Sequence, residues 1–133
     1  MKNKKLIIFI TITIFVIGGT LIYRKLSVHK HISSENISSI QLWGVHVQQR
    51  EASSEEKQKI IKAFNSIYSI RRNKDFAGTT PDSGIVIELK AGEHISIISS
   101  GKDFEIQRNI NGEEVSYWGR NKYIKSLLET LSR

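Results

Sequence analysis

The sequence predicts an α+β fold, in which a two-layer domain follows an N-terminal transmembrane helix. Three observations lead to this fold class. Four short apolar runs follow one another between Gly84 and Trp118, each separated from the next by a turn signal, which is typical of an antiparallel meander. Two amphipathic helical patterns lie on either side of these runs and need apolar cover. Residues 6–22 carry no charge, which is typical of a membrane span.

The turns of the meander set the register of its strands. We expect a three-residue loop at residues 90–92, a two-residue turn at residues 100–101, and an Asn-Gly turn at residues 111–112, which is the strongest hairpin signal in the chain. All three turns place the large apolar side chains on one face, and a slip of one residue would break this agreement. The expected facing pairs are Ile87 with Ile95, Ile85 with Ile97, Ile97 with Phe104, Ile95 with Ile106, Ile106 with Tyr117, and Arg108 with Val115.

Residues 1–25 are predicted to be a signal-anchor segment. Three lysines precede the uncharged run at residues 6–22, and Arg24 and Lys25 follow it. A helix over this run is roughly 25 Å long, close to the ~30 Å of the hydrocarbon core, so we expect one pass through the cell membrane with the lipid bilayer as partner. Short N-terminal tails usually stay in the cytoplasm, which predicts that the C-terminal domain lies outside it. Cleavage as a signal peptide is the alternative, and the domain would then be secreted.

A polar tether over residues 26–36 is expected to connect this segment to a domain over residues 37–133. The domain opens with a predicted strand from Ile37 to Gln49. Gly44 interrupts the alternation of apolar residues in that strand, which indicates a bulge or a bend.

Two helices complete the predicted domain. The first begins at Ser53, which forms a capping box with Glu56, and the second begins after Asn121 as its N-cap. The Ile-rich face of the meander is the only large apolar surface that can cover both. We therefore expect an antiparallel sheet of about five strands, the last four forming the meander, with both helices on one face. The expected apolar stripes are Ile60, Ile61, Phe64, Ile67 and Tyr68 in the first helix, and Ile124, Leu127, Leu128 and Leu131 in the second.

The composition excludes several classes of protein. The net charge is +7, but basic and acidic residues nearly balance from Ser27 onward, so no nucleic-acid partner is predicted. The absence of cysteine excludes disulfides, thiol catalysis, cysteine-based zinc sites and the lipid attachment of a bacterial lipoprotein. His29 and His31 have a spacing that can bind a metal, but a solvated charge cluster is the simpler interpretation. No metal and no cofactor are predicted.

A catalytic role is not predicted either. In the predicted register, Glu88 lies opposite His94, and such a pair could carry out acid–base chemistry in a small hydrolase. An ion pair between neighbouring strands explains the same arrangement. The hydrolase is therefore kept as an alternative, and no enzyme is predicted.

Two regions are candidates for a binding surface. Trp43 and Trp118 both point away from the expected core, and they would form one exposed aromatic patch if the first strand paired beside the strand of Trp118. The loop over residues 70–83 could hold an anion, although its spacing matches neither a P-loop nor a dinucleotide fingerprint. The candidate binding residues of this loop are Arg71, Arg72, Lys74, Thr79, Thr80 and Ser83.

The chain resembles a group of small membrane-anchored proteins of Gram-positive bacteria. The resemblance is carried by the segment from Lys2 to Lys25 and, more loosely, by the run from Ser100 to Ile106. It covers the whole length as a pattern of anchor, tether and small domain. It implies attachment to a membrane through the apolar run and implies no catalytic residues.

These observations predict a non-enzymatic, membrane-tethered module outside the cytoplasm that binds a protein, a peptide or another component of the cell envelope. The alternative is a structural component of an envelope assembly, built through strand edges or helices. A hydrolase using His94 and Glu88 is a further alternative from a different class.

Overall fold

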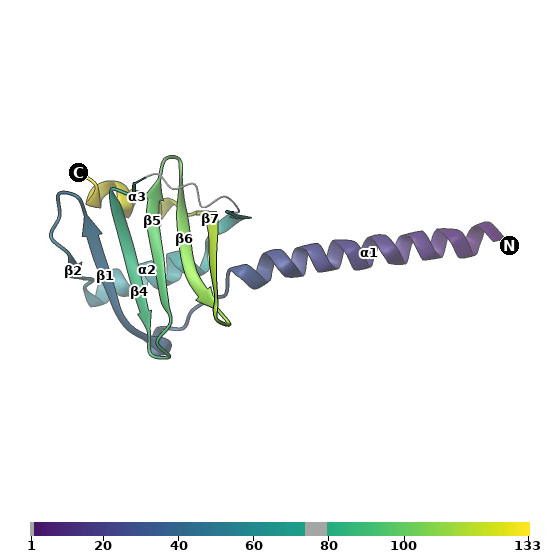
Figure 1. Cartoon of the computed structure of the whole chain (residues 1–133), viewed down its shortest axis with the longest axis horizontal. Coiled ribbons are helices and arrows are strands. Elements are labelled where there is room, and N and C mark those ends of the chain that lie inside the picture. Colours follow the sequence, from purple (N-terminus) through teal and green to yellow (C-terminus); the bar gives the residue numbers. More distant parts are fainter. Residues whose placement is uncertain (1, 74–79) are drawn as a thin grey trace. The chain divides into compact units, whose positions relative to one another are not determined.

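The computed structural model describes the backbone of residues 2–73 and 80–133, and the side chains of residues 7–20, 28–73 and 80–133. The chain divides into two compact units, Met1–Lys30 and His31–Arg133 (Figure 1). The second unit begins inside the predicted tether, because Ile32 belongs to the folded domain. The Asn65 side chain accepts a hydrogen bond from the Ile32 amide at 2.9 Å and donates one to the Ile32 carbonyl at 2.9 Å.

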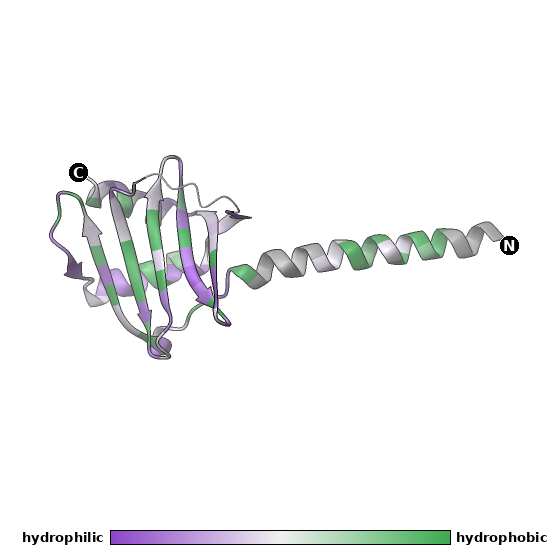
Figure 2. Cartoon of the chain, in the orientation of Figure 1, coloured by the Kyte–Doolittle hydropathy of each residue, from purple (hydrophilic) through white to green (hydrophobic). Residues whose placement is uncertain are grey.

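The first unit is a single helix, α1 (Lys2–Val28). Its large apolar side chains between Ile7 and Ile17 are each 49–78% exposed, and Figure 2 shows this apolar stretch along the helix. The hydroxyls of Thr11 and Thr13 donate to the carbonyls four residues earlier, both at 2.9 Å. Within the described part of the chain, no helix combines the length and the apolarity that crossing a membrane requires. The membrane span expected over residues 6–22 is therefore not found.

In the described residues of the second unit, seven strands form one antiparallel sheet with the order β2-β1-β4-β5-β6-β7-β3. Two helices and a short 3-10 turn complete the domain, which confirms the α+β class. The sheet has two more strands than expected, and the additional strands, β2 and β3, are its two edges. The elements are η1 (Ser34–Asn36), β1 (Ile37–Gly44), β2 (Arg50–Glu51), α2 (Ser54–Asn65), β3 (Tyr68–Arg72), β4 (Ser83–Leu89), β5 (His94–Ser100), β6 (Asp103–Ile110), β7 (Glu113–Arg120) and α3 (Lys122–Leu131).

Both helices pack on one face of the sheet, as the sequence predicts (Figure 1). α3 lies against β1, β4 and β5, and α2 packs beside α3. Alternate residues of the strands point toward the helices and are buried, which gives the domain one apolar core. The fully buried large side chains are Ile40, Leu42, Ile60, Phe64, Ile85, Ile87, Ile95, Ile97, Phe104, Ile106, Tyr117 and Ile124.

The meander and most of its register are confirmed. Ile85 pairs with Ile97 and Ile87 pairs with Ile95, and at the next hairpin Ile106 pairs with Tyr117. The register predicted between β5 and β6 is wrong, because the turn lies at residues 101–102 rather than 100–101. Ile97 therefore faces Ile106 instead of Phe104, and Ile95 faces Arg108. This is a shift of two residues, so each side chain stays on its predicted face.

The first strand is shorter than predicted, because it ends at Gly44 rather than at Gln49. A Cβ atom at Gly44 would lie 1.8 Å from the carbonyl oxygen of Leu131, the last residue of α3. The glycine therefore allows the end of a helix to approach the backbone of β1, which the interrupted apolar pattern alone does not indicate.

The first helix of the domain is also shorter than its apolar stripe suggested. The capping box of Ser53 and Glu56 is present, and α2 ends at Asn65. Ile67 and Tyr68 therefore do not belong to the helical stripe: Ile67 is buried beyond the helix, and Tyr68 begins β3 with 59% of its surface exposed. Ser69 has a φ of 54°, so the chain turns sharply as the edge strand begins.

Candidate functional site

Cationic side chains gather at one end of the sheet, where the β5–β6 turn, the β7–α3 junction and the start of β3 meet. The tight turn begins at Gly101, whose φ of 59° is the left-handed conformation that glycine adopts most easily. Asn121 caps α3, because its side chain accepts hydrogen bonds from the amides of Tyr123 at 3.0 Å and Ile124 at 3.2 Å. The turn presents Lys102, and the capped helix presents two lysines in its first turns.

These elements surround a cavity of about 550 Å³, which we call the cationic pocket. Four of the side chains that line it carry a positive charge and one carries a negative charge. The aromatic ring of Tyr68 is also part of its wall. The cationic residues are Lys102, Arg120, Lys122 and Lys125, the anionic residue is Asp103, and Phe104, Gly119 and Asn121 complete the lining.

The single carboxylate of the cationic pocket is already paired. Asp103 accepts a hydrogen bond from Arg120 Nε at 2.7 Å and another from an Arg71 terminal nitrogen at 2.6 Å. The hydrogen bond from Arg120 lowers the pKa of Asp103, and the charges of Arg71 and Lys125 lower it further. Asp103 therefore stays ionised and is bound by two arginines.

The lysines of the pocket are less engaged. Within the described residues, neither Lys102 nor Lys122 forms an ion pair, and Lys125 lies 3.8 Å from Glu129, its neighbour four residues along α3. Exposed pairs of this kind contribute little to stability. The positive charges of Lys102 and Lys122 therefore remain available to a ligand.

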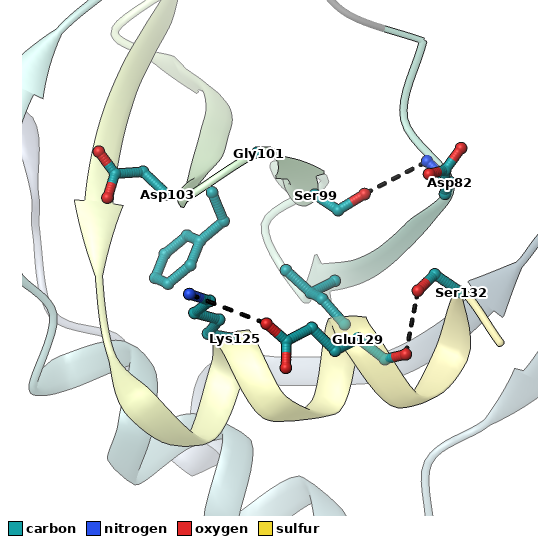
Figure 3. Close-up of a pocket in the computed structure, with 9 residues that line it drawn as sticks. Asp82, Ser99, Gly101, Asp103, Lys125, Glu129 and Ser132 are labelled. Atoms are coloured by element: carbon teal, nitrogen blue, oxygen red, sulfur yellow. Dashed lines mark hydrogen bonds and ion pairs between the residues drawn. The ribbon is translucent and has the colours of Figure 1, made fainter.

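A second, smaller cavity of about 220 Å³ adjoins the cationic pocket and shares Asp103, Phe104 and Lys125 with it (Figure 3). Its other charged residues are Asp82 and Glu129, so its character is acidic. Figure 3 shows Lys125 reaching along α3 toward Glu129, and Ser99 bonded to the amide of Asp82. The positive charge of the cationic pocket therefore does not continue along α3 into this smaller cavity.

The two tryptophans lie on the open face of the sheet but do not form one patch. β1 pairs with β4, so the condition on which the predicted patch depended is not met. Trp43 pairs with Gly84, Gly84 with Ile98, Ile98 with Glu105, and Glu105 with Trp118. Four strand spacings of about 4.8 Å separate the two indoles, or roughly 19 Å. The Trp43 ring covers Gly84, where an added Cβ would lie 2.5 Å from the indole.

The candidate residues of the 70–83 loop serve different purposes. Arg71 forms an ion pair with Asp103 beside the cationic pocket. Arg72, on the edge strand β3, is exposed and pairs with Tyr117 of β7. Ser83 is fully buried, and its hydroxyl donates to the Leu128 carbonyl at 2.7 Å. This bond gives Ser83 a structural role, because it ties β4 to α3. Thr80 is exposed, and Lys74 and Thr79 lie outside the described residues.

The pair proposed for acid–base chemistry is present as a cross-strand pair. Glu88 lies opposite His94, and His94 is exposed. Within the residues that the structure describes, no group of three or more histidines, cysteines or carboxylates lies close enough to hold a metal ion.

A buried carboxylate on the open face was not anticipated from the sequence. Glu105 is 3% exposed and accepts hydrogen bonds from the Ser116 hydroxyl, from Asn73 at 3.2 Å and from Gln107 at 3.3 Å. These bonds link the end of β3 to β6 and β7. They give the carboxylate a structural explanation, since buried polar groups are normally hydrogen bonded.

Sequence reasoning also missed the cationic pocket. Its residues come from the segments at positions 68, 102–104 and 119–125, and each segment alone has the composition of an ordinary polar surface. The available signal was the cluster of cationic residues on both sides of the Asn121 cap. That signal acquires meaning only when the β5–β6 turn is known to lie beside the start of α3.

No known protein family, curated protein or solved structure matches this chain. The resemblance to membrane-anchored proteins of Gram-positive bacteria stays a prediction.

Proposed function

We propose that this chain is a membrane-attached domain that binds an anionic ligand in the cationic pocket and does not convert it chemically. The observation that carries the proposal is the concentration of four cationic side chains in one cavity of about 550 Å³. Basic and acidic residues nearly balance in the domain as a whole, so this concentration is local. Small-ligand sites are concave and combine apolar or aromatic walls with a few polar or charged groups that orient the ligand.

The attachment to a lipid bilayer is proposed for residues 6–22. Large apolar side chains between Ile7 and Ile17 are exposed all round α1, which is costly in water and favourable in lipid. The hydroxyls of Thr11, Thr13 and Thr20 are bonded within the helix, so they add no unpaired polar group. With lysines on both sides of the run, we propose a position at the cell membrane and a domain outside the cytoplasm.

Two features make binding a better proposal than assembly through strand edges. The edge strand β2 has only the two exposed charged residues Arg50 and Glu51. The other edge, β3, is interrupted at Ser69, where φ is positive and the register shifts. Short, charged or bulged edges are poor templates for an additional strand.

Photo-crosslinking in the cells that make the protein tests the binding role. A photoreactive residue is placed at Tyr68 in the full chain, with a matched probe at Lys90 in the β4–β5 turn at the opposite end of the sheet. We expect a discrete adduct from position 68 alone, lost when Lys102 and Lys122 are both changed to Glu. A correctly folded chain that gives no adduct from position 68 would contradict the proposal, and an adduct only from a third probe, placed at Trp118, would move the binding surface to the open face.

A further inference from the structure

We infer that the cationic pocket binds an organic phosphate ester, with the phosphate group held by Lys102, Lys122 and Arg120 and the organic group against Tyr68. This inference rests on the proposed binding role of the pocket and names the class of ligand. It does not depend on how α1 is attached.

The charge of the pocket favours phosphate over a carboxylate. Asp103 is bound by two arginines and does not neutralise the lysines. Within the described residues, Lys102 and Lys122 then remain without an ion pair beside the guanidinium of Arg120, whereas Lys125 lies 3.8 Å from Glu129. A phosphate monoester carries about −1.5 to −2 charges and three acceptor oxygens, so it can engage several of these donors at once. A carboxylate offers one charge and two oxygens.

Arg120 is held in a geometry that suits this role. Its Nε donates to Asp103, and this hydrogen bond raises the pKa of Arg120. Within the described residues, the terminal nitrogens of the Arg120 guanidinium form no hydrogen bond. Because the fork is planar, fixing one side with a carboxylate leaves the other donors oriented for an anion.

The shape and lining of the pocket favour an ester over inorganic phosphate. A cavity of about 550 Å³ holds considerably more than one phosphate group. Tyr68, which is 59% exposed, lines the cavity, and Phe104 and the side-chain-free Gly119 are also part of its lining. An aromatic face beside lysines can cover a sugar, a glycerol unit or a ring while the cations hold the phosphate.

The phosphate ester can belong to a lipid headgroup or to a soluble compound, and one experiment separates the two sources. The full chain is placed in nanodiscs of neutral phosphatidylcholine, and glycerol 3-phosphate is titrated while the amide resonances of residues 68, 102, 120 and 122 are followed by NMR. In the second arm, the nanodiscs contain phosphatidic acid, whose headgroup is a phosphate monoester, and no soluble ligand is added. Lys102→Gln/Lys122→Gln is the pocket variant. Lys90→Gln/Arg133→Gln removes the same charge elsewhere and is the control.

We expect saturable shifts in at least one arm, about tenfold weaker binding in the pocket variant, and unchanged binding in the control variant. Added salt should weaken the binding, because exposed charges are screened. Shifts in the soluble arm assign a free phosphate ester, and shifts in the lipid arm assign a headgroup. Absence of shifts in both arms, or equal weakening in the two variants, overturns the inference. If a protein is crosslinked from position 68 while neither arm responds, the binding role stands and the phosphate ester is wrong.

Discussion

Replacing Gly44 with alanine should destabilise the domain by forcing β1 and the end of α3 apart. The added Cβ would lie 1.8 Å from the carbonyl oxygen and 2.7 Å from the carbonyl carbon of Leu131. Both are backbone atoms, so no side-chain rotation relieves the overlap, and a real Cβ is essentially never closer than 3.0 Å to such a neighbour.

The magnitude follows from the two ways in which the domain can respond. If α3 holds its place, overpacking costs about 1–3 kcal/mol. If the last turn of α3 gives way, Leu131 leaves the core, and the loss of its burial costs about 1.5–3 kcal/mol. The cheaper response sets the outcome, so Gly44→Ala should lower the free energy of unfolding by about 1–3 kcal/mol. With a slope near 1–3 kcal/mol per M of urea, the midpoint should fall by about 1 M.

The assay is urea unfolding of the full chain in detergent micelles, followed by tryptophan fluorescence. The matched comparison is a chain that ends at Thr130, which lacks the Leu131 carbonyl contact. In that shorter chain the overlap with Leu131 is absent, so Gly44→Ala should be nearly neutral. A slight stabilisation can remain, because alanine restricts the unfolded chain more than glycine does. Equal destabilisation in both chains would refute the explanation, since two residues in contact should show non-additive effects.

Three further predictions test the support of α3, the cap of α2 and the role of α1. Ser83→Ala removes the buried hydroxyl that donates to the Leu128 carbonyl and should lower the free energy of unfolding, measured in urea, by about 0.5–1.5 kcal/mol, because one buried hydrogen bond is lost while the carbonyl keeps its bond from the Ser132 amide. The hydrogen bond from Arg50 lowers the pKa of Glu56 to about 2. Stability from this bond is therefore present above pH ~4.3, the unfolded pKa, and is lost as the pH falls toward 2; Glu56→Gln should flatten that loss in urea midpoints measured against pH. Phe15→Glu should reduce flotation of the full chain with phosphatidylcholine vesicles, and unchanged flotation would count against the proposed bilayer contact.

The β4–β5 and β6–β7 hairpins could be predicted from the sequence, because the residues of their turns favour one backbone conformation. Gly92 and Gly112 have φ values of 86° and 84°, and Asn111 adopts 54°, all in the region that these residue types tolerate best. The β5–β6 turn was misplaced by one residue, although its strands kept the correct faces. The apolar pattern specifies which residues share a face, but a shift of two residues preserves that pattern and is decided by packing.

The edge strands could not be predicted for a different reason. Arg50 and Glu51 form a strand of two residues without any apolar alternation. Tyr68 continues the apolar spacing of α2, so periodicity alone extends the helix past its true end at Asn65. Short elements at an edge are decided by the backbone groups of their neighbours, which local patterns do not report.

The position of α3 connects the fold to the proposed binding role. Near its C-terminal end the helix is held by the close approach of Gly44 and by the bond from Ser83, and at its start Asn121 caps it. A helix fixed in this way sets the backbone positions of Lys122 and Lys125, while β6 and β7 supply Asp103 and Arg120 from the sheet. Sites built on helices and strands hold the backbone positions of their residues more precisely than sites built on loops. The core residues that anchor α3 should therefore influence ligand affinity without touching the ligand, because they set the distance between the lysines and the sheet.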